Sequence, residues 1–250
     1  MAKFKGVVKF SGTIGGITGV NSKEGFHARA KQDIPTSRYL TAPEYTSFRM
    51  NGKYTGMASR MSMAFRQPIK LFGMAASDAR MYSRLNAVMR KILMSDPVSR
   101  KGEFNFTNGI ATTTGKQALL DFEFNATVAF DRVFKGSYEL DSASATLTLS
   151  GFVPKKALQW PAGATHATLE SGLLHFDFAK GEGKFAGSAP RVLSKNEGAN
   201  DIVLPSAAPT TGAGMTKVYF LKVVFSQEVG GVKYPLKGND GGVMKVVAVE

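Results

Sequence analysis

The residues of this 250-residue chain that are best suited to chemistry are cations. Arginine is prominent among them, and its planar guanidinium can hold a phosphate or a carboxylate through two parallel hydrogen bonds. Nine of the eleven arginines fall before residue 104. We therefore predict an anion-binding surface, above all for nucleic acid, in this part of the chain. Its candidate residues are Arg29, Lys31, Arg49, Lys53, Arg60, Arg80, Arg84 and Lys91.

The positive charge of the chain is concentrated in its first part. Residues 1–103 hold 18 Lys and Arg against 6 Asp and Glu, a net charge of +12, whereas residues 104–250 hold 14 against 13, a net charge of +1. A surface that only needed solubility would scatter its charge, so this concentration indicates an anionic partner. One basic helix edge alone is usually a solvated face. The prediction depends on several segments being basic together.

Other kinds of chemistry find little support in the sequence. The chain has no cysteine, which excludes disulfides, thiolate metal sites and a cysteine nucleophile. The segment from Gly109 to Gln117 approaches a phosphate-binding loop but has the wrong spacing and lacks the residue that would hold magnesium, so we interpret it as a surface turn. His27, His166 and His175 are too few and too dispersed for a zinc site, and we interpret His175 as lying on the solvent side of a strand. We predict a protein that is not an enzyme and that uses no cofactor or metal.

Extended and helical segments follow one another in the basic part. Residues 3–31 are punctuated by glycine and rich in strand-forming residues, which predicts a β-ribbon. A helix is predicted to begin at Thr41, where Thr-Ala-Pro-Glu can form a capping box, and to end or kink at Pro68. A second helix is predicted over 77–95, between a Ser-Asp cap and an Asp-Pro stop. Each helix has an apolar face beside a basic stripe, so we expect a helix hairpin.

After residue 103 the hydrophobic period changes from the helical value to two, which indicates half-buried antiparallel strands. Strands are expected at 120–124, 145–149, 165–169, 174–178, 217–225, 232–236 and 243–249. The segments 180–187 and 195–214 are predicted to be loops. The predicted fold class is α+β: an N-terminal β-ribbon and amphipathic helix hairpin, followed by an antiparallel immunoglobulin-like β-sandwich. The predicted domains are a basic module over 1–103 and a sandwich over 104–250.

Three parts of the sequence resemble a known family. These are the opening FSGTIGGITGVNSKEGFHARAK, the helical middle rich in Arg and Met, and the closing FSQEVGGVKYPLKGNDGGVMKVVAVE. They resemble an uncharacterised family of small basic proteins from the Bacteroidota. The resemblance covers most of the chain and implies a lineage, but it implies no activity and assigns no site residue.

The chain shows no sign of a targeting or membrane segment. Lys9 interrupts the apolar stretch near the start, and the longest apolar candidate, 218–229, contains Lys222 and Glu228. We therefore expect a cytoplasmic protein without a transmembrane segment. Export without a signal peptide, or a place in a virion, stays open.

Two functional hypotheses follow. The first is a non-enzymatic interaction protein whose cationic module binds nucleic acid; six phosphate contacts would give a slope of about −5 for log affinity against log salt on duplex DNA. Phe26, Tyr39 and Tyr45 could stack on unpaired bases, although such rings are more often core residues. The second is a structural subunit of a larger assembly, such as a phage particle or a surface or filament complex, in which the ribbon makes subunit contacts and the basic part meets an acidic protein surface. Homo-oligomerisation would fit this second hypothesis. An enzyme acting on a carbohydrate or acyl substrate ranks last.

Overall fold

The computed structural model describes residues 10–22, 25–31, 34–207, 214–238 and 240–250, and the chain divides into two compact units, Met1–Asn51 and Gly52–Glu250. Each unit has its own set of strands. The division after Glu103 that the charge distribution suggests stays a prediction.

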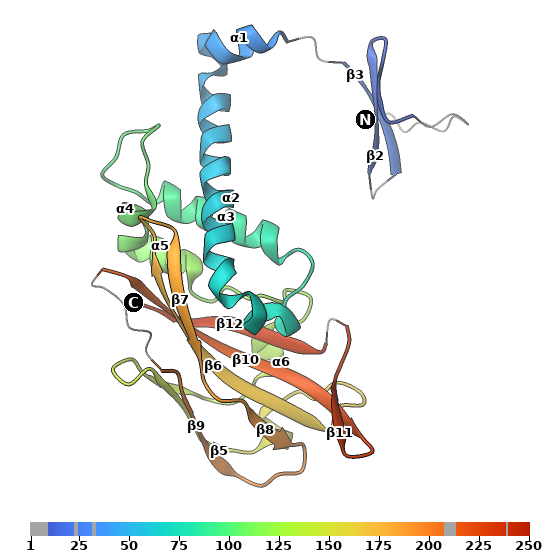
Figure 1. Ribbon diagram of the computed structural model, residues 1–250, viewed down its shortest axis with the longest axis vertical. Coiled ribbons are helices and arrows are strands. Elements are labelled where there is room, and N and C mark those ends of the chain that lie inside the picture. The colour runs from blue at the N-terminus through green and yellow to red at the C-terminus, as the bar shows by residue number, and fades with distance from the viewer. Residues whose placement is uncertain (1–9, 23–24, 32–33, 208–213, 239) are drawn as a thin grey trace. The chain divides into compact units, whose positions relative to one another are not determined.

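The first unit contains a small antiparallel ribbon, within the segment where the sequence predicts one. Its strands are β1 (Gly12–Ile14), β2 (Ile17–Ser22) and β3 (Gly25–Ala30), in the order β1-β2-β3 (Figure 1). Ile14 pairs with Ile17, and Ile17 pairs with Ala30, so these three apolar residues share one face of the ribbon. Ile14 and Ile17 are both exposed.

A short helix precedes the long one. The elements are α1 (Thr36–Thr41), the 3-10 turn η1 (Pro43–Tyr45) and α2 (Thr46–Gly73). The predicted capping box at Thr41 is therefore wrong, because Thr41 is the last residue of α1 and its hydroxyl donates to the carbonyl oxygen of Ser37 at 2.9 Å. Glu44 instead accepts hydrogen bonds from the guanidinium of Arg38 at 3.1 and 3.2 Å.

The sequence predicts that the helix ends or kinks at Pro68; α2 does not end there but continues to Gly73 with Pro68 inside it. A proline inside a helix removes one backbone donor and crowds the preceding turn. The helix persists because its apolar face is anchored on both sides of the proline: Phe65 and Ile69 are buried, and the Phe65 ring packs edge to face on Phe176 with centroids 5.2 Å apart.

Three more helices follow in the second unit. After the turn η2 (Met74–Ala76) come α3 (Met81–Met94), α4 (Phe106–Ala111) and α5 (Thr113–Leu119). The end of α3 lies close to the predicted one, but its start does not: Arg80, and neither Ser77 nor Asp78, is the N-cap residue, and no side chain caps the helix. The carboxylate of Asp78 accepts the N–H of Arg80 at 2.7 Å just before the helix. Beyond its end, Asp96 accepts the N–H groups of Val98 and Asn105 at 2.9 and 3.0 Å.

The segment interpreted as a surface turn forms α4 and α5, and its glycines are packing residues. Gly109 and Gly115 are buried. A Cβ on Gly109 would collide with the carbonyl oxygen of Ile92, and a Cβ on Gly115 would collide with the carbonyl oxygen of Gly109. The prediction of a surface turn is wrong, because these glycines let α4 approach α3 and α5 approach α4.

The strands of the second unit form two antiparallel sheets. The larger has the order β11-β10-β6-β7, with β12 also paired to β10 and β8 also paired to β6, and the smaller has the order β4-β5-β9. The strands are β4 (Glu139–Asp141), β5 (Thr146–Phe152), β6 (His166–Asp177), β7 (Glu182–Gly187), β8 (Arg191–Ser194), β9 (Asn200–Pro205), β10 (Thr216–Val229), β11 (Val232–Pro235) and β12 (Gly242–Val249). Two short helices, α6 (Phe130–Val133) and α7 (Pro154–Ala157), accompany them. Helices cover one face of the larger sheet and the smaller sheet lies toward its other face (Figure 1).

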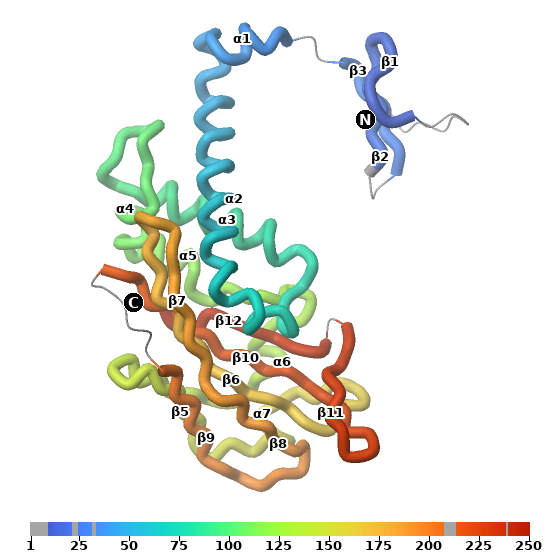
Figure 2. The backbone as a smooth tube through the Cα atoms, in the orientation of Figure 1, coloured from blue at the N-terminus to red at the C-terminus, as the bar shows by residue number. Residues whose placement is uncertain are grey.

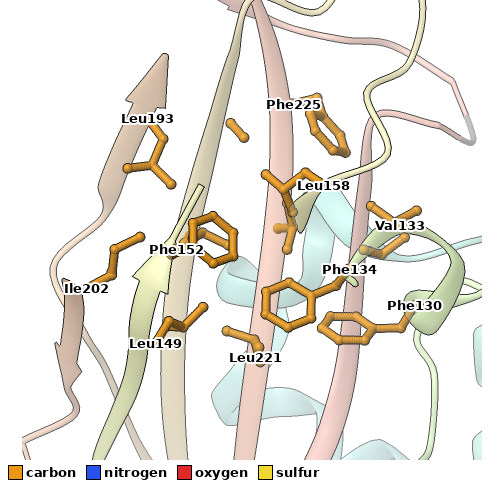
Figure 3. Close-up of a cluster of buried hydrophobic side chains, with 14 of the residues drawn as sticks. Phe130, Val133, Phe134, Leu149, Phe152, Leu158, Leu193, Ile202, Leu221 and Phe225 are labelled. Carbon is orange, nitrogen blue, oxygen red and sulfur yellow. The ribbon is translucent and has the colours of Figure 1, made fainter. Parts of the chain in front are cut away.

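A buried apolar cluster fills the space between the two sheets (Figure 3). Leu221 and Phe225 reach into it from β10, while Leu149 and Ile202 reach into it from β5 and β9. Phe134, directly after α6, stacks its ring on this cluster. The strand alternation that the sequence shows therefore does face a common core.

The strands predicted from alternation are largely confirmed, and the predicted architecture is confirmed only as a mixed fold with antiparallel sheets. β6 joins two predicted strands, whereas β7 and β9 occupy segments that were predicted to be loops; residues 208–213 of the second loop lie outside the described residues. Residues 120–124 form no strand, although the N–H of Phe124 donates to the carbonyl of Met244 in β12 at 2.9 Å. An immunoglobulin-like sandwich is not confirmed, because the larger sheet curls into a half-barrel and carries helices on one face (Figure 2). None of the helices in the described ranges has the length and apolarity needed to cross a bilayer.

Candidate functional site

Two of the predicted anion-binding residues, Arg29 and Lys31, lie in or directly after the third strand of the ribbon, β3. Arg29 is exposed and pairs with Thr18 across the ribbon. Lys31 directly follows β3, is also exposed, and donates its backbone N–H to the carbonyl of Gly16 at 2.7 Å. These two cations belong to the first unit.

Arg49 has a role inside the first unit. Its guanidinium donates to the carbonyl oxygens of Tyr39 and Ala42 at 2.7 and 2.9 Å and to the hydroxyl of Thr46 at 3.0 Å. These acceptors lie at the end of α1 and at the start of α2. Arg49 therefore fastens the connection between the two helices, with few donors left for an external anion.

Lys53 and Arg60 lie on one flank of α2. The ammonium of Lys53 donates to the carbonyl of Gly102 at 2.8 Å, which ties the helix to the loop after α3. Arg60 is exposed and lines a pocket of about 500 Å³ together with Lys180 from the turn between β6 and β7.

Four further cations lie where α2 leads into α3. Arg66 and Lys70 line a hollow of about 460 Å³, and Arg80 and Arg84 line an adjoining one of about 750 Å³. Asp78 and Ala79 line both hollows, so the two adjoin, and we treat them together as one surface. We name it the elbow groove and define it by Arg66, Lys70, Asp78, Arg80, Tyr82 and Arg84.

An arginine and a tyrosine are stacked in the elbow groove. The Cζ atom of Arg66 lies 4.1 Å from the ring centroid of Tyr82, a distance typical of a cation–π contact. The Nε of Arg66 donates to the carbonyl of Ser62 at 3.2 Å, which orients the guanidinium. Tyr82 is 52% exposed, so part of its ring faces solvent. The pair presents a flat cationic and aromatic surface.

The cations of the elbow groove differ in how far they are neutralised. Arg84 forms an ion pair with Asp78 at 2.8 Å, and its other terminal nitrogen donates to the carbonyls of Glu123 and Phe124. Burial alone would raise the pKa of Asp78, but the Arg84 guanidinium and the N–H groups of Ala126 and Arg80 hold that pKa below its usual range. The charge of Arg84 is thus compensated and structural.

Among the described residues, Lys70 and Arg80 form no ion pair, nor does Arg66. The elbow groove therefore carries three uncompensated positive charges. Among the lining residues of the two hollows, Asp78 is the single carboxylate, and Arg84 already pairs with it. Such a surface attracts anions by long-range electrostatics.

The structure brings together only part of the predicted set. Arg80 and Arg84 share the elbow groove, and Lys91 lies farther along α3, two turns beyond Arg84 and outside the groove lining. Arg66 and Lys70 were missed as site residues, because the break predicted at Pro68 separates them; in the structure α2 runs through and they lie one turn apart on the same helix face.

His166 and His175 differ in their surroundings: the ring of His166 has the hydroxyl of Thr165 3.0 Å from Nδ1 and the carboxylate of Glu228 3.4 Å from Nε2. His175, predicted on the solvent side, is buried, because β6 is a central strand and its residue lies between Lys184 of β7 and Lys217 of β10. Burial lowers the pKa of His175, and the positive charge of Lys217 lowers it further. Over the described part of the chain, no group of three or more His, Asp or Glu side chains is arranged to hold a metal ion.

The resemblance to a Bacteroidota family stays a prediction that rests on the sequence. Comparison of the chain with family models, with curated proteins and with solved structures finds no match.

Proposed function

We propose that this protein binds a polyanion, above all nucleic acid, through the elbow groove and catalyses no reaction. The observation that carries the proposal is the stacked pair of Arg66 and Tyr82 in a groove that also contains the uncompensated cations Lys70 and Arg80. Cations contact phosphates, and an exposed aromatic ring accepts an unpaired base. We expect the protein to act in the cytoplasm.

The charge balance of this helical region supports a polyanion. Residues 52–103 hold 10 Lys and Arg against 3 Asp and Glu. Two of these three carboxylates are engaged within the fold, Asp78 by Arg84 and Asp96 by backbone N–H groups after α3. The positive charge therefore acts outward, and a ligand with repeated negative charges gains most from it.

The length of the elbow groove favours an extended ligand over a single phosphate. Its two hollows adjoin at Asp78, and its cations come from α2 and from the start of α3. A compact phosphate site would instead converge several donors on one point. Because a stacking ring stands in the groove, we assign the ligand as single-stranded nucleic acid.

Fluorescence anisotropy with a labelled single-stranded oligonucleotide tests the proposal. Three free cations predict a slope of about −2 for log affinity against log salt on a single strand. Each of the variants Arg66→Gln, Lys70→Gln and Arg80→Gln should flatten that slope by about 0.7. The matched control Lys155→Gln removes one exposed cation of α7 and should leave the slope unchanged. Binding that is independent of salt, or equally reduced by the control, would overturn the proposal.

Tyr82 separates stacking from charge in the same assay. Tyr82→Phe keeps the ring and should retain affinity, whereas Tyr82→Leu should weaken binding about tenfold or more, because stacking a base contributes about 1–3 kcal/mol. If Tyr82→Phe and Tyr82→Leu bind the oligonucleotide with equal affinity, the ring does not stack on a base and the groove binds by charge alone.

The ribbon supports a second candidate function, that of a subunit in a larger assembly. Ile14 and Ile17 lie beside each other on one face and are 65% and 51% exposed. Apolar strand faces normally pack on another layer, and a subunit contact would supply one. Light scattering after size exclusion tests this: Ile17→Thr should shift an assembled species toward monomer, and a monodisperse monomer of the unaltered chain at high concentration would overturn it.

A further inference from the structure

A second pocket lies away from the elbow groove, between α2, the start of α4 and the turn from β6 to β7. It has a volume of about 500 Å³, within the range of small-molecule sites. We name it the α2–α4 pocket and define it by Met57, Arg60, Met61, Phe106, Phe178 and Lys180.

The inner surface of the α2–α4 pocket is apolar and largely rigid. Phe106 and Phe178 are buried, and their rings stack with centroids 6.4 Å apart and an interplanar angle of 30°. Met57 and Met61 lie one turn apart on α2 and are half-buried. The two buried rings pack the base of the lining, and the partly exposed thioethers of Met57 and Met61 form a surface that can adapt to an apolar body of variable shape.

A glycine holds the third wall close to α2. Gly181 has a φ of +71°, a conformation that favours glycine, and a Cβ built there would lie 3.5 Å from the Cβ of Ala64. The turn that carries Lys180 is therefore fixed beside the helix that carries Arg60.

The rim of the α2–α4 pocket is cationic. Its lining contains Arg60 and Lys180 and no carboxylate. Both side chains are exposed, and neither forms an ion pair within the described ranges. Asp177, from the same turn, directs its Oδ1 to the N–H groups of Ala179 and Lys180 at 2.8 and 3.2 Å, so its carboxylate is engaged by its own backbone.

We propose that the α2–α4 pocket binds a small amphiphilic carboxylate, with the apolar body against Met57 and Met61 and the anionic head at Arg60 and Lys180. The head group should be anionic, because Arg60 and Lys180 are both positively charged and no carboxylate stands among the lining residues. The apolar inner surface selects the body, because a fully hydrophilic anion would leave it exposed to water. This assignment gives Arg60 a ligand different from that of the elbow groove, and it does not depend on nucleic-acid binding.

Isothermal titration of the full chain with decanoate and with decanol tests the assignment. The two probes share an apolar body and differ in charge. Decanoate should bind with one site per chain and more tightly than decanol. The double variant Arg60→Gln/Lys180→Gln should weaken decanoate about tenfold, as expected from two exposed charge contacts, and should leave decanol unchanged.

Two further variants separate the pocket from general effects. Ala64→Leu adds a side chain to the pocket wall and should weaken both probes, and its near-ultraviolet circular dichroism should show that the fold is retained. The matched control Arg132→Gln/Lys156→Gln removes two exposed cations elsewhere and should change neither affinity.

Equal affinities of decanoate and decanol, or equal effects of the two charge-removing double variants on decanoate, would overturn the proposal. Failure of this test is distinguishable from failure of the elbow groove. Arg66→Gln should weaken the oligonucleotide and not decanoate, and the Arg60→Gln/Lys180→Gln variant should do the reverse.

Discussion

The guanidinium of Arg84 holds both carboxylate oxygens of Asp78, with Nη1 2.9 Å from Oδ1 and 2.8 Å from Oδ2. Asp78 also accepts the N–H of Ala126 at 2.7 Å, so the pair links the start of α3 to the loop that follows α5. The side chains of Arg84 and Asp78 are 30% and 9% exposed. The pair is thus mostly removed from water, where one partner without the other is costly.

We expect Arg84→Gln to lower the free energy of unfolding by about 2 kcal/mol, less than the loss for a fully buried pair because Arg84 keeps some contact with water. Urea unfolding measures the change. Arg80→Gln, at the N-cap position just before α3, is the matched control and should change stability by less than about 0.5 kcal/mol. The anisotropy assay should show the opposite order. Arg80→Gln should flatten the slope of log affinity against log salt, and Arg84→Gln should leave that slope unchanged. An unchanged urea midpoint for Arg84→Gln would contradict the structural role.

His175 gives the fold a dependence on pH. Because its folded pKa is lowered by burial and then by Lys217, the unfolded chain binds the proton more readily. The stabilising contribution is complete above the unfolded value of about 6.5 and is lost as the pH falls below it. We expect the free energy of unfolding to decrease between about pH 7 and pH 5, and His175→Gln to reduce that decrease. Imidazole titration by nuclear magnetic resonance checks the cause directly, and a His175 midpoint at or above 6.5 would refute it.

Gly109 is closely packed and Gly52 is not, so substitution by alanine should change stability in opposite directions at the two positions. Gly109→Ala places a methyl group against the carbonyl of Ile92, so α4 must move away from α3. We expect a loss of about 3 kcal/mol, as for an overpacked core. Gly52→Ala meets nothing within 4 Å in α2 and should gain about 0.5–1 kcal/mol from helix propensity. Thermal unfolding of the two variants compares them, and equal shifts in the same direction would be inconsistent with the packing role of Gly109.

The sequence predicts the elements of this fold better than their arrangement. Alternation locates β5 and part of β6 because alternate side chains face a core, and helical periodicity locates α3 for the same reason. Pro68 misled the prediction because tertiary packing at Phe65 and Ile69 outweighs one lost backbone hydrogen bond. Packing partners distant in sequence are invisible to periodicity.

The same limit applies to the candidate site. Cationic residues are evident in the sequence, but a charge count does not distinguish Arg84, whose donors are used inside the fold, from Arg80, whose side chain forms no ion pair in the described ranges. The contact between Arg66 and Tyr82 joins two helices across a turn, and nothing in their spacing predicts it. Compensation of charge is a tertiary property.

A buried ion pair beneath α2 provides the last prediction. The ammonium of Lys222 lies 2.6 Å from Oε2 of Glu170, donates to the carbonyl of Phe72 at 3.2 Å and sits 4.0 Å from the Phe72 ring centroid. The side chains of Lys222 and Glu170 are only 8% and 19% exposed. Two adjacent strands thus present one compensated pair to the end of the helix.

Glu170→Gln leaves the Lys222 ammonium without its counter-charge in a site that excludes water, and we expect a loss of about 3 kcal/mol of stability. The double variant Glu170→Leu/Lys222→Met removes both charges and replaces them with apolar atoms of similar volume, so it should recover most of that loss. A double-mutant cycle by urea unfolding, completed with Glu170→Leu and Lys222→Met alone, measures the coupling. A cycle in which the two single losses simply add would mean that the ion pair contributes nothing beyond the packing of its side chains.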